Sequence, residues 1–389
     1  MRILHIAPYL PSEKAVHAGG VCMAQEIETL RSLGHSVVCC SFYQQQYDAK
    51  CVINDKNCYL EKLTKLKKII HCLQHPFTAP YFATRLSNSF FRRLVKIIKD
   101  RKIDAIHAEY AAMGLYIKLK KKFPYLKFNL ILHDVTYQAY IRKFKKSHGL
   151  KRLLYIFNNK LIFKNEGYAV NNSDCVLTFC DKDSELVKKY YSPKQVRVIN
   201  TYFGLDKMLA IDNSEEYHTK HGICFMGQMG RKENEEAAVR LIEIYNRIKD
   251  RLEGNKLYIF GSNPSEQLIK YSSDDVIICG YIEDVEKAMS KCRIAVFPLL
   301  SGAGIKIKVL TSLALGIPTI TSNVGAEGID ETGKFLYLAN SDQEFENSIL
   351  YLITNEAECV RQSEIVKEFV HDNFSWDSTV WEFKVLYSA

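Results

Sequence analysis

Short apolar runs alternate with helical patterns along the first half of the chain. Residues 2–7 read RILHIA, an apolar strand, and a loop separates them from residues 21–33, whose apolar positions recur at helical spacing. Gly34 ends that helix, and the apolar run HSVVCCSFY follows. This order predicts a βαβ unit. Further strands are expected at 103–110, 127–134, 173–180 and 195–200, so the first half is predicted to form a parallel sheet.

The same alternation restarts after a polar stretch near residue 210, which lacks an apolar period and is expected to be a linker. Strands are predicted at 222–229, 256–261, 276–282, 293–300, 318–322 and 334–339, and helices at 234–249, 285–292 and 305–315. These patterns predict an α/β fold of two doubly wound sheets in tandem, with a ligand between them at the carboxyl ends of the strands.

The composition is that of a globular protein. The chain has 389 residues, 47% hydrophobic and 25% charged, which is long enough for two domains. No run approaches the ~18–20 apolar residues of a spanning helix, and the first apolar run is too short for a secretory signal. We therefore expect a cytoplasmic protein. Its 12 cysteines are then expected to be thiols packed in the core, and no metal is expected.

The charge is divided unevenly between the two halves. Residues 1–200 hold 34 Lys and Arg against 15 Asp and Glu, a net charge of +19, whereas residues 201–389 hold 19 against 29, a net charge of −10. This asymmetry indicates an anionic partner for the first half: nucleic acid, phosphorylated lipid or a membrane surface. For any single basic cluster, solvated lysine-rich helices are the better explanation.

The basic residues gather in blocks, two of which flank apolar and aromatic segments. Cations beside exposed apolar side chains are typical of an interfacial membrane anchor. Zinc-finger spacing and an RNP-type aromatic motif are both missing from the sequence, which favours an anionic membrane surface over nucleic acid. The blocks lie at 62–68, 92–99, 118–122 and 142–152.

The first predicted loop ends in Gly19-Gly20, directly before a helix. Glycines there allow a backbone to approach a phosphate, which the free N–H groups and positive end of the helix attract. A plain turn is the alternative. The GxGxxG spacing of a dinucleotide site is missing, which argues against an NAD enzyme.

A stronger phosphate signal is PLLSGAGIKIKVLTSLALGIP at 298–318. A buried strand ends at Pro298, and a glycine loop leads into a helix with Lys306 and Lys308 in its first turn. Lysines at that position oppose the helix macrodipole. A phosphate held by backbone N–H groups and Lys306 explains their presence, and solvation of both lysines is the alternative.

These motifs resemble a known family. The glycine pair, His133-Asp134, FMGQMGRKENEEAA, LYIFGSNP, VIICGYIED and PLLSGAGIKIKVLTSLALGIPTITSNVGAEGI are similar to retaining glycosyltransferases of family 4, of the bacterial surface-polysaccharide type. The resemblance implies the GT-B fold: a Rossmann-like acceptor domain at 1–205, a Rossmann-like donor domain at 206–370, and a closing helix at 371–389 that returns to the first domain.

The resemblance also implies the site. A nucleotide-diphospho-sugar binds mainly to the second domain as a co-substrate, without a metal or another cofactor. Lys306 and the loop before it neutralise the diphosphate, the backbone at 280–282 meets the base, and Arg231 lies near a phosphate-binding position. The implied donor-binding residues are Gly19, Gly20, Arg231, Gly280, Tyr281, Ile282, Gly302, Ala303, Gly304, Ile305, Lys306, Thr311 and Glu327.

His133 matches the histidine that the family places at the sugar, and Asp134 is expected to orient His133 or the acceptor. The two form the implied catalytic pair. A packed core histidine is the alternative for His133.

One departure concerns the two glutamates that many members carry eight positions apart. Here the ribose position falls on Thr311, a poorer hydrogen-bond acceptor than a carboxylate. Glu327 is the nearest carboxylate that remains, and it either replaces the glutamate or caps a loop. The nucleotide is therefore left open.

The sequence predicts a retaining, metal-independent glycosyltransferase that uses a glycan or lipid-linked acceptor, peripheral on the inner face of the cytoplasmic membrane. The alternatives are a catalytically silent GT-B module that binds a sugar nucleotide or a partner transferase, and a sugar-nucleotide epimerase. The sugar, the acceptor, the linkage and the oligomeric state are left open.

Overall fold

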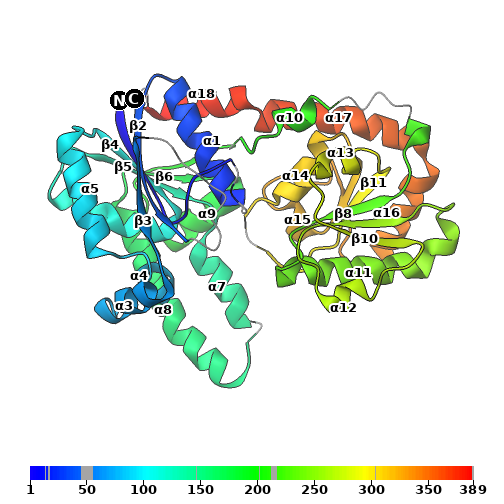
Figure 1. The fold of residues 1–389 in the computed structure, drawn as a ribbon, viewed down its shortest axis with the longest axis horizontal. Helices are drawn as coiled ribbons and strands as arrows, with labels where there is room; N and C mark the ends of the chain where they lie inside the picture. The colour runs from blue at the N-terminus through cyan, green and yellow to red at the C-terminus, as the bar shows by residue number, and fades with distance from the viewer. Residues whose placement is uncertain are drawn as a thin grey trace. The chain divides into compact units, whose positions relative to one another are not determined.

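The computed structural model describes residues 1–387 except 14, 16–17, 45–55, 146, 201, 212–216 and 303. It divides into two compact units, which are described separately below (Figure 1). Unit 1 comprises Met1–Gly204 with Asp377–Ala389, and unit 2 comprises Leu205–Trp376. The return segment starts later than position 371, because helix α17 continues to Phe374.

The described residues of unit 1 form a fully parallel sheet of seven strands. Its inner strands are short, mostly buried runs, as burial on both faces of a parallel sheet requires, whereas the two edge strands are half-buried. The order is β3 (Cys58–Lys62), β2 (Ser36–Tyr43), β1 (Arg2–Ala7), β4 (Ala105–Glu109), β5 (Lys127–Leu132), β6 (Cys175–Thr178) and β7 (Val196–Val198).

Helices flank this sheet, and the C-terminal helix packs in the same unit. Two of them, α7 and α8, run against each other as a hairpin that projects beyond the sheet (Figure 1). They are α1 (Ala18–Ser32), α3 (Lys65–Gln74), α4 (Pro80–Ala83), α5 (Asn88–Asp100), α6 (Tyr110–Gly114), η1 (Leu115–Lys121), α7 (Thr136–Lys145), α8 (Gly149–Asn172), α9 (Asp181–Tyr190) and α18 (Trp376–Tyr387).

The described residues of unit 2 form a second parallel sheet, of six strands. Their order is β10 (Val276–Gly280), β9 (Leu257–Phe260), β8 (Ile223–Met226), β11 (Ile294–Phe297), β12 (Thr319–Thr321) and β13 (Tyr337–Leu338). The helices are α10 (Asp206–Leu209), η2 (Tyr217–Thr219), α11 (Lys232–Ile248), η3 (Lys249–Arg251), α12 (Glu266–Ile269), α13 (Val285–Met289), α14 (Ile307–Ala314), α15 (Asn323–Ala326), α16 (Asp342–Thr354) and α17 (Glu356–Phe374).

The predicted fold class is confirmed: both sheets are parallel and Rossmann-like, and each reverses its strand order once. The reversal lies between β1 and β4 in unit 1 and between β8 and β11 in unit 2. Across 1–387, apart from the gaps named above, none of the helices is both long enough and apolar enough to cross a bilayer. The described cysteines are all free thiols.

Candidate functional site

The donor-binding residues implied for unit 2 follow the carboxyl ends of its strands. Arg231 comes after β8, and the loop 298–306 comes after β11. These are the two strands between which the order reverses. Loops at such a point leave the sheet on opposite sides and open a crevice for a ligand. The topology therefore brings Arg231 and Lys306 to one crevice.

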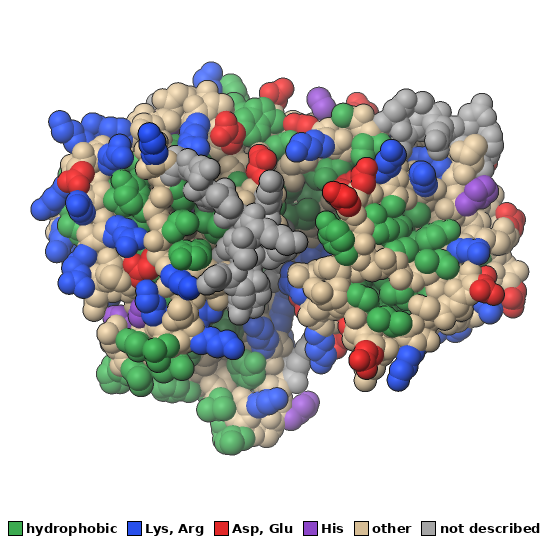
Figure 2. Space-filling model, in the orientation of Figure 1, with side chains coloured by type: hydrophobic (Ala, Val, Ile, Leu, Met, Phe, Trp, Pro, Cys, Tyr) green, Lys and Arg blue, Asp and Glu red, His purple; other side chains and the backbone are tan. Residues whose placement is uncertain are grey.

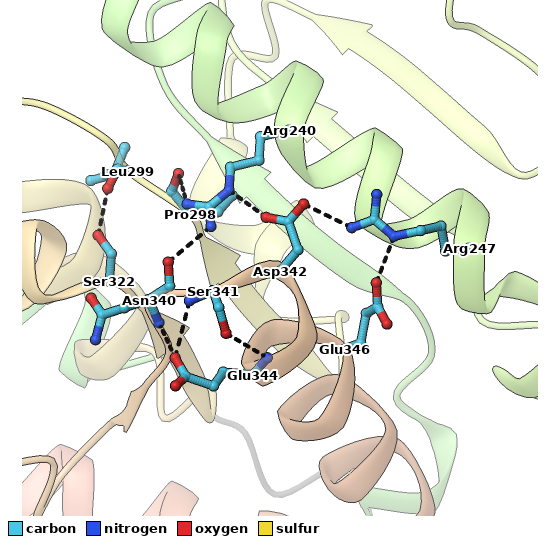
Figure 3. A network of polar contacts seen from close by, with 10 residues as sticks. All are labelled: Arg240, Arg247, Pro298, Leu299, Ser322, Asn340, Ser341, Asp342, Glu344 and Glu346. Atoms are coloured by element: carbon cyan, nitrogen blue, oxygen red, sulfur yellow. Dashed lines mark hydrogen bonds and ion pairs between the residues drawn. The ribbon is translucent and has the colours of Figure 1, made fainter.

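A network of polar contacts holds the start of the 298–306 loop (Figure 3). The Arg240 guanidinium donates to Asp342 Oδ1 at 2.8 Å and to the carbonyl oxygens of Pro298 and Asn340 at 3.4 and 3.1 Å. Ser322 Oγ donates to the Leu299 carbonyl at 2.6 Å. The loop therefore leaves β11 from a fixed backbone.

Lys306 lies at the N-cap of α14, because the helix begins at Ile307 and not at position 305 as predicted. Its side chain is buried, with 8% exposed, and its Nζ donates to the Gly304 carbonyl at 2.5 Å. Gly302 has φ +150°, and a Cβ there would lie 2.8 Å from Lys306 Cε, so the lysine stem passes directly over a glycine. Gly304, with φ +66°, gives the loop a second left-handed turn.

Lys308 does lie in the first turn of α14, as predicted. Its Nζ donates to Asn234 Oδ1 and lies 5.4 Å from the centre of the Phe225 ring. Burial, followed by the charges of Arg231 and Lys306, lowers the pKa of Lys308 to about 7. A protonated Lys308 is therefore disfavoured until an anion enters.

Carboxylates only partly compensate these three cations. Arg231 Nε donates to Glu233 Oε1 at 2.8 Å, and Glu327 Oε2 lies 3.9 Å from Lys306 Nζ. The structure thus brings Glu327 to Lys306. We define Arg231, Lys306 and Lys308 as the cation cluster, which has the charge and donors to bind a diphosphate.

The remaining implied residues of unit 2 are spread more widely. Gly280, with φ +68°, ends the edge strand β10, and its carbonyl accepts from the N–H of Gly261 at 2.9 Å. Tyr281 is 76% exposed, whereas Thr311 lies buried in α14. Ile282 and Ile305 are half-buried, and Ala303 lies outside the described residues.

In unit 1, three strand ends meet around His133. Gly19 and Gly20 lie within the first turn of α1, and not in the loop before it as predicted. A Cβ at Gly19 would lie 1.9 Å from Tyr110 Oη and 3.7 Å from His133 Nδ1, so only glycine fits there. His133 follows β5, and Tyr110 follows β4. The glycine pair is therefore a close-approach position beside His133.

Tyr110 adopts a backbone conformation that is rare for a bulky residue, with φ +62°. Its ring stacks on His133 with centroids 3.8 Å apart and an interplanar angle of 5°. The strained backbone of Tyr110 thus allows its ring to cover one face of the His133 imidazole.

Glu109, the last residue of β4, binds three histidines. Its Oε1 accepts from His5 Nε2 at 2.9 Å and from His107 Nε2 at 3.2 Å, and its Oε2 accepts from His133 Nε2 at 2.8 Å. The Glu109 carboxylate is fully buried. Burial opposes ionisation, but the hydrogen bonds from His107, His133 and His5 overcome it and hold the pKa of Glu109 well below its usual range.

A second buried carboxyl group completes this His–Glu cluster. His107 Nε2 lies 3.2 Å from Glu26 Oε2, and His107 Nδ1 lies 2.8 Å from the hydroxyl of Tyr387 on the C-terminal helix. Burial, followed by repulsion from Glu109, raises the pKa of Glu26 to about 8. Burial lowers the pKa of His107, but Tyr387 and the two carboxyl groups raise it by more. The pKa of His107 therefore lies well above its usual value. An ionised Glu109, a protonated His107 and a neutral Glu26 result.

The ionised Glu109 fixes the tautomer of His133. A carboxylate only accepts, so His133 Nε2 carries the proton and Nδ1 of the neutral ring is left as an acceptor beside Gly19. Such a nitrogen accepts a hydrogen bond from a sugar hydroxyl. Glu109 is therefore a carboxylate that orients His133, and the role expected for the adjacent Asp134 stays a prediction.

Metal ligation is the other chemistry open to this cluster. His5, Glu26, His107 and Glu109 offer ligand atoms that lie within 4.8 Å of one another, as do Cys22, Glu26 and His133. The hydrogen bonds above account for the positions of Glu109, Glu26 and His107, whereas the buried His5 Nδ1 has no hydrogen-bond partner among the described residues.

Glu109, Glu26, His5 and His107 were not predicted from the sequence. For His5, His107 and Glu109 the available signal was a polar residue inside an otherwise apolar strand, LHIA or IHAE. His5 and His107 are register partners on the adjacent strands β1 and β4, which only the sheet order reveals.

Comparisons with known proteins agree with this geometry. Residues 220–355 match the family model of glycosyl transferases group 1. An uncharacterized glycosyltransferase of Methanocaldococcus jannaschii is 24% identical over 293 residues, which cover 70% of each chain. An uncharacterized 44.6 kDa protein in the cps region of Klebsiella pneumoniae is 23% identical over 395 residues, 96% of this chain and 95% of that protein.

Solved structures give the same fold. A sucrose-phosphate synthase from Thermosynechococcus elongatus superposes with a TM-score of 0.72 at 15% identity, covering 100% of this chain and 98% of that one. The Anabaena protein HepE, solved in complex with UDP, superposes with a TM-score of 0.68 at 12% identity over 100% of both chains. These comparisons confirm the GT-B fold and the resemblance to glycosyltransferases.

The His–Glu cluster predicts a pH-dependent stability. Glu26 is protonated in the folded chain up to a pKa of about 8, against 4.5 ordinarily, so the stability present below pH 4.5 is lost as the pH rises through 8. Glu26→Gln cannot ionise, and we expect its melting temperature to exceed that of the parent by several degrees at pH 9 but not at pH 5. Circular dichroism across that range measures the difference. Glu28→Gln, at an exposed position of the same helix, is the control, and parallel curves for parent and Glu26→Gln would contradict the assignment.

The cation cluster predicts that diphosphate binding depends on Lys306. Lys306→Ala should weaken binding of UDP at least tenfold, about 1.4 kcal/mol, because a buried cation is lost. Calorimetry measures the affinity, with the exposed Lys270→Ala of the same unit as the matched control. Equal losses in both variants, or none, would remove Lys306 from the phosphate site.

Lys308 predicts proton uptake on binding. A diphosphate raises the pKa of Lys308 above about 7, so binding at pH 8 takes up a proton and the affinity falls as the pH rises from 7 to 9. Calorimetry of UDP in two buffers of different ionisation enthalpy measures the uptake, which Lys308→Met should abolish. Uptake that persists in Lys308→Met would assign it to another group.

Proposed function

We propose that this chain transfers a sugar from a nucleoside-diphosphate sugar to an acceptor hydroxyl with retention of the anomeric configuration. The proposal proceeds from the match of residues 220–355 to glycosyl transferases group 1 and from the GT-B fold. The observation that carries the proposal is the cation cluster at the strand reversal of unit 2, where the pKa of Lys308 is lowered until an anion binds.

In the proposed reaction the bond between the anomeric carbon and the diphosphate breaks as the bond to the acceptor oxygen forms. Lys306 and the N–H groups at the start of α14 stabilise the charge on the departing diphosphate. An oxygen of that diphosphate takes the acceptor's proton on the same face of the sugar. No protein nucleophile, metal or other cofactor takes part in this scheme.

We propose that His133 binds the sugar of the donor. Its unprotonated Nδ1 accepts a hydrogen bond from a sugar hydroxyl, and Glu109 preserves that tautomer through the reaction because its own pKa is held low. Glu109 does not touch the substrate in this scheme and is a positioning residue.

Uridine nucleotides are the first donors to test. The neighbour HepE was solved in complex with UDP, which supports a UDP-sugar as the donor. Thr311 occupies the ribose position of the motif, and Glu327 near Lys306 supplies the carboxylate in our proposal.

Thr311 is also the observation that favours a second candidate, a GT-B module that binds the sugar nucleotide without turnover. The residue is neutral and buried where many members have a carboxylate. Slow release of free nucleotide from a sugar nucleotide in the absence of acceptor distinguishes the transferase from the silent module.

We propose that unit 1 binds to a membrane surface. Its α3, the loop after it and α8 expose apolar side chains: Leu73 is 75% exposed, Phe77 81% and Leu153 64%. Figure 2 shows hydrophobic side chains gathered over α3 and the α7–α8 hairpin, with Lys and Arg among them. Amphipathic surfaces of this kind enter the headgroup layer of anionic membranes.

The setting follows from this surface. One relative lies in the cps region of Klebsiella pneumoniae, which supports surface-polysaccharide synthesis with a lipid-linked glycan as the acceptor. The inner face of the cytoplasmic membrane is the location we propose.

A donor screen tests the transfer directly. Purified protein is incubated with a panel of nucleotide sugars and membrane lipid extract, and the anomeric proton coupling of the fresh product is read by NMR. We expect one donor to be consumed and its anomeric configuration kept, and His133→Ala to lower the rate of transfer while circular dichroism shows that the chain stays folded. An inverted product would overturn retention, and no turnover with any donor would favour the silent module.

Membrane recruitment is tested with vesicles. The parent should bind anionic vesicles at low salt and leave them at high salt, because the attraction of its cations is screened. The double change Leu66→Ser and Leu73→Ser on α3 should reduce recruitment at least fivefold in co-sedimentation. Tyr351→Ser, at an exposed position in unit 2, is the control. Recruitment that ignores salt and the α3 changes would count against this surface.

A further inference from the structure

The α7–α8 hairpin encloses a groove that the glycosyl transfer described above does not use. Its volume is about 450 Å³, and it is mostly apolar. Tyr137, Ile141 and Phe144 line it from α7, and Ile156 and Phe163 from α8. The two lysines on its lining are Lys145 and Lys160, both exposed to solvent.

Cations without acidic neighbours in sequence surround the groove. Residues 135–165 hold eight Lys and Arg and no Asp or Glu. The Arg152 guanidinium lies 4.9 Å from the centre of the Phe144 ring, and Lys143 Nζ lies 4.4 Å from that of Tyr140. Apolar walls with a cationic rim complement a ligand that has a hydrocarbon part and an anionic part.

The groove also contains a polar group that needs a partner. Asn159 lines it, and in the described part of the chain the buried Asn159 Oδ1 has no hydrogen-bond partner. A purely hydrocarbon ligand would leave this amide unsatisfied, at a cost. A ligand with polar groups at the end of its chain would satisfy it.

The hairpin is fixed at the His133 end. The N–H groups of Thr136 and Tyr137, which open α7, donate to the buried Glu166 of α8 at 2.9 and 2.8 Å. Tyr191 Oη donates to the same carboxyl group at 2.8 Å. The start of α7 therefore stays beside His133, only three residues earlier in the chain.

The length of α7 sets the distance between the two ends. Ten helical residues span about 15 Å, so Lys145 lies roughly that far from the helix start beside His133. This is the scale of a short glycan rather than of one sugar ring. The apolar groove runs along this length, from Tyr137 near the start of α7 to Lys145 at its end, and the first turns of α8 expose Leu150, Leu153 and Leu154.

We propose that the groove binds the hydrocarbon chain of a phosphate-linked lipid acceptor, with Lys145 and Lys160 on its phosphates. The bound acceptor directs its glycan along α7 toward His133. The groove would bind one lipid acceptor molecule, whereas α3 would contact the headgroups of many membrane lipids. The inference rests on the proposed transfer and adds the class of acceptor and its binding site.

The test uses geranylgeranyl diphosphate as the probe, below its micelle concentration, in equilibrium dialysis with the full chain. Lys145→Glu with Lys160→Glu should weaken binding at least tenfold while leaving the weaker binding of geranylgeraniol within twofold. Both lysines are exposed, so this variant keeps the fold. Ile141→Ser with Phe144→Ser should weaken binding of both probes at least fivefold.

The α3 variant, Leu66→Ser with Leu73→Ser, is the matched control. It should bind geranylgeranyl diphosphate within twofold of the parent while its vesicle recruitment falls. An equal loss of probe binding in the α3 and groove variants would replace the groove by nonspecific surface adsorption and overturn the proposal, as would groove variants that bind like the parent.

UDP binding separates this proposal from the proposed transfer. Groove variants should keep the parent affinity for UDP. Probe binding that depends on the groove, in a chain that consumes no sugar nucleotide, would support the groove and reject the transfer. Transfer to a soluble acceptor by a chain that does not bind the probe would reject the groove and leave the transfer standing.

Discussion

A single reversal of strand order in each parallel sheet determines where the chemistry of this chain lies. Loops that leave neighbouring strands at a reversal diverge to opposite faces, so side chains beside them face a crevice instead of a helix. In unit 1 the reversal places Glu109 at the end of β4, next to His5 on β1. In unit 2 it places Arg231 and Lys306 after β8 and β11.

The two units compensate their buried charges in different ways. Unit 1 balances an ionised Glu109 internally, with donors from three histidines and a neutral Glu26. The outcome of that arrangement is one fixed tautomer of His133. Unit 2 gathers cations with fewer carboxylates, and burial together with the charges of Arg231 and Lys306 lowers the pKa of Lys308. An anionic ligand relieves it, so the diphosphate belongs to unit 2 in our scheme.

The sequence sufficed for the fold class because parallel sheets produce short, mostly apolar runs between helical patterns, although the edge strand β3, with the sequence CYLEK, was not predicted. A glycine loop before a helix is also a local pattern, so Lys306 could be singled out from the sequence. The His–Glu cluster could not be found in this way. Its members lie on β1, α1, β4 and α18 and directly after β5. Only the folded chain brings His5 beside His107, and His107 in turn beside Tyr387.

Local pattern also misplaced two boundaries. The sequence began the helix at 305, but Lys306 is its N-cap, since the left-handed Gly304 keeps the loop open until Ile307. The glycine pair was expected in a loop, yet Gly19 and Gly20 are helical, and the missing side chain of Gly19 allows the close approach of Tyr110. The sequence shows that α3 and α8 contain apolar and basic residues. It does not show that these apolar side chains are exposed, which for α8 follows from the α7–α8 hairpin that extends past the sheet.

The most direct test of diphosphate binding at the cation cluster is a crystal structure of the chain with UDP. The account predicts that the β-phosphate lies within hydrogen-bond distance of Lys306 Nζ and of the first N–H groups of α14. A diphosphate bound away from Lys306, with the lysine still donating to the Gly304 carbonyl, would contradict it.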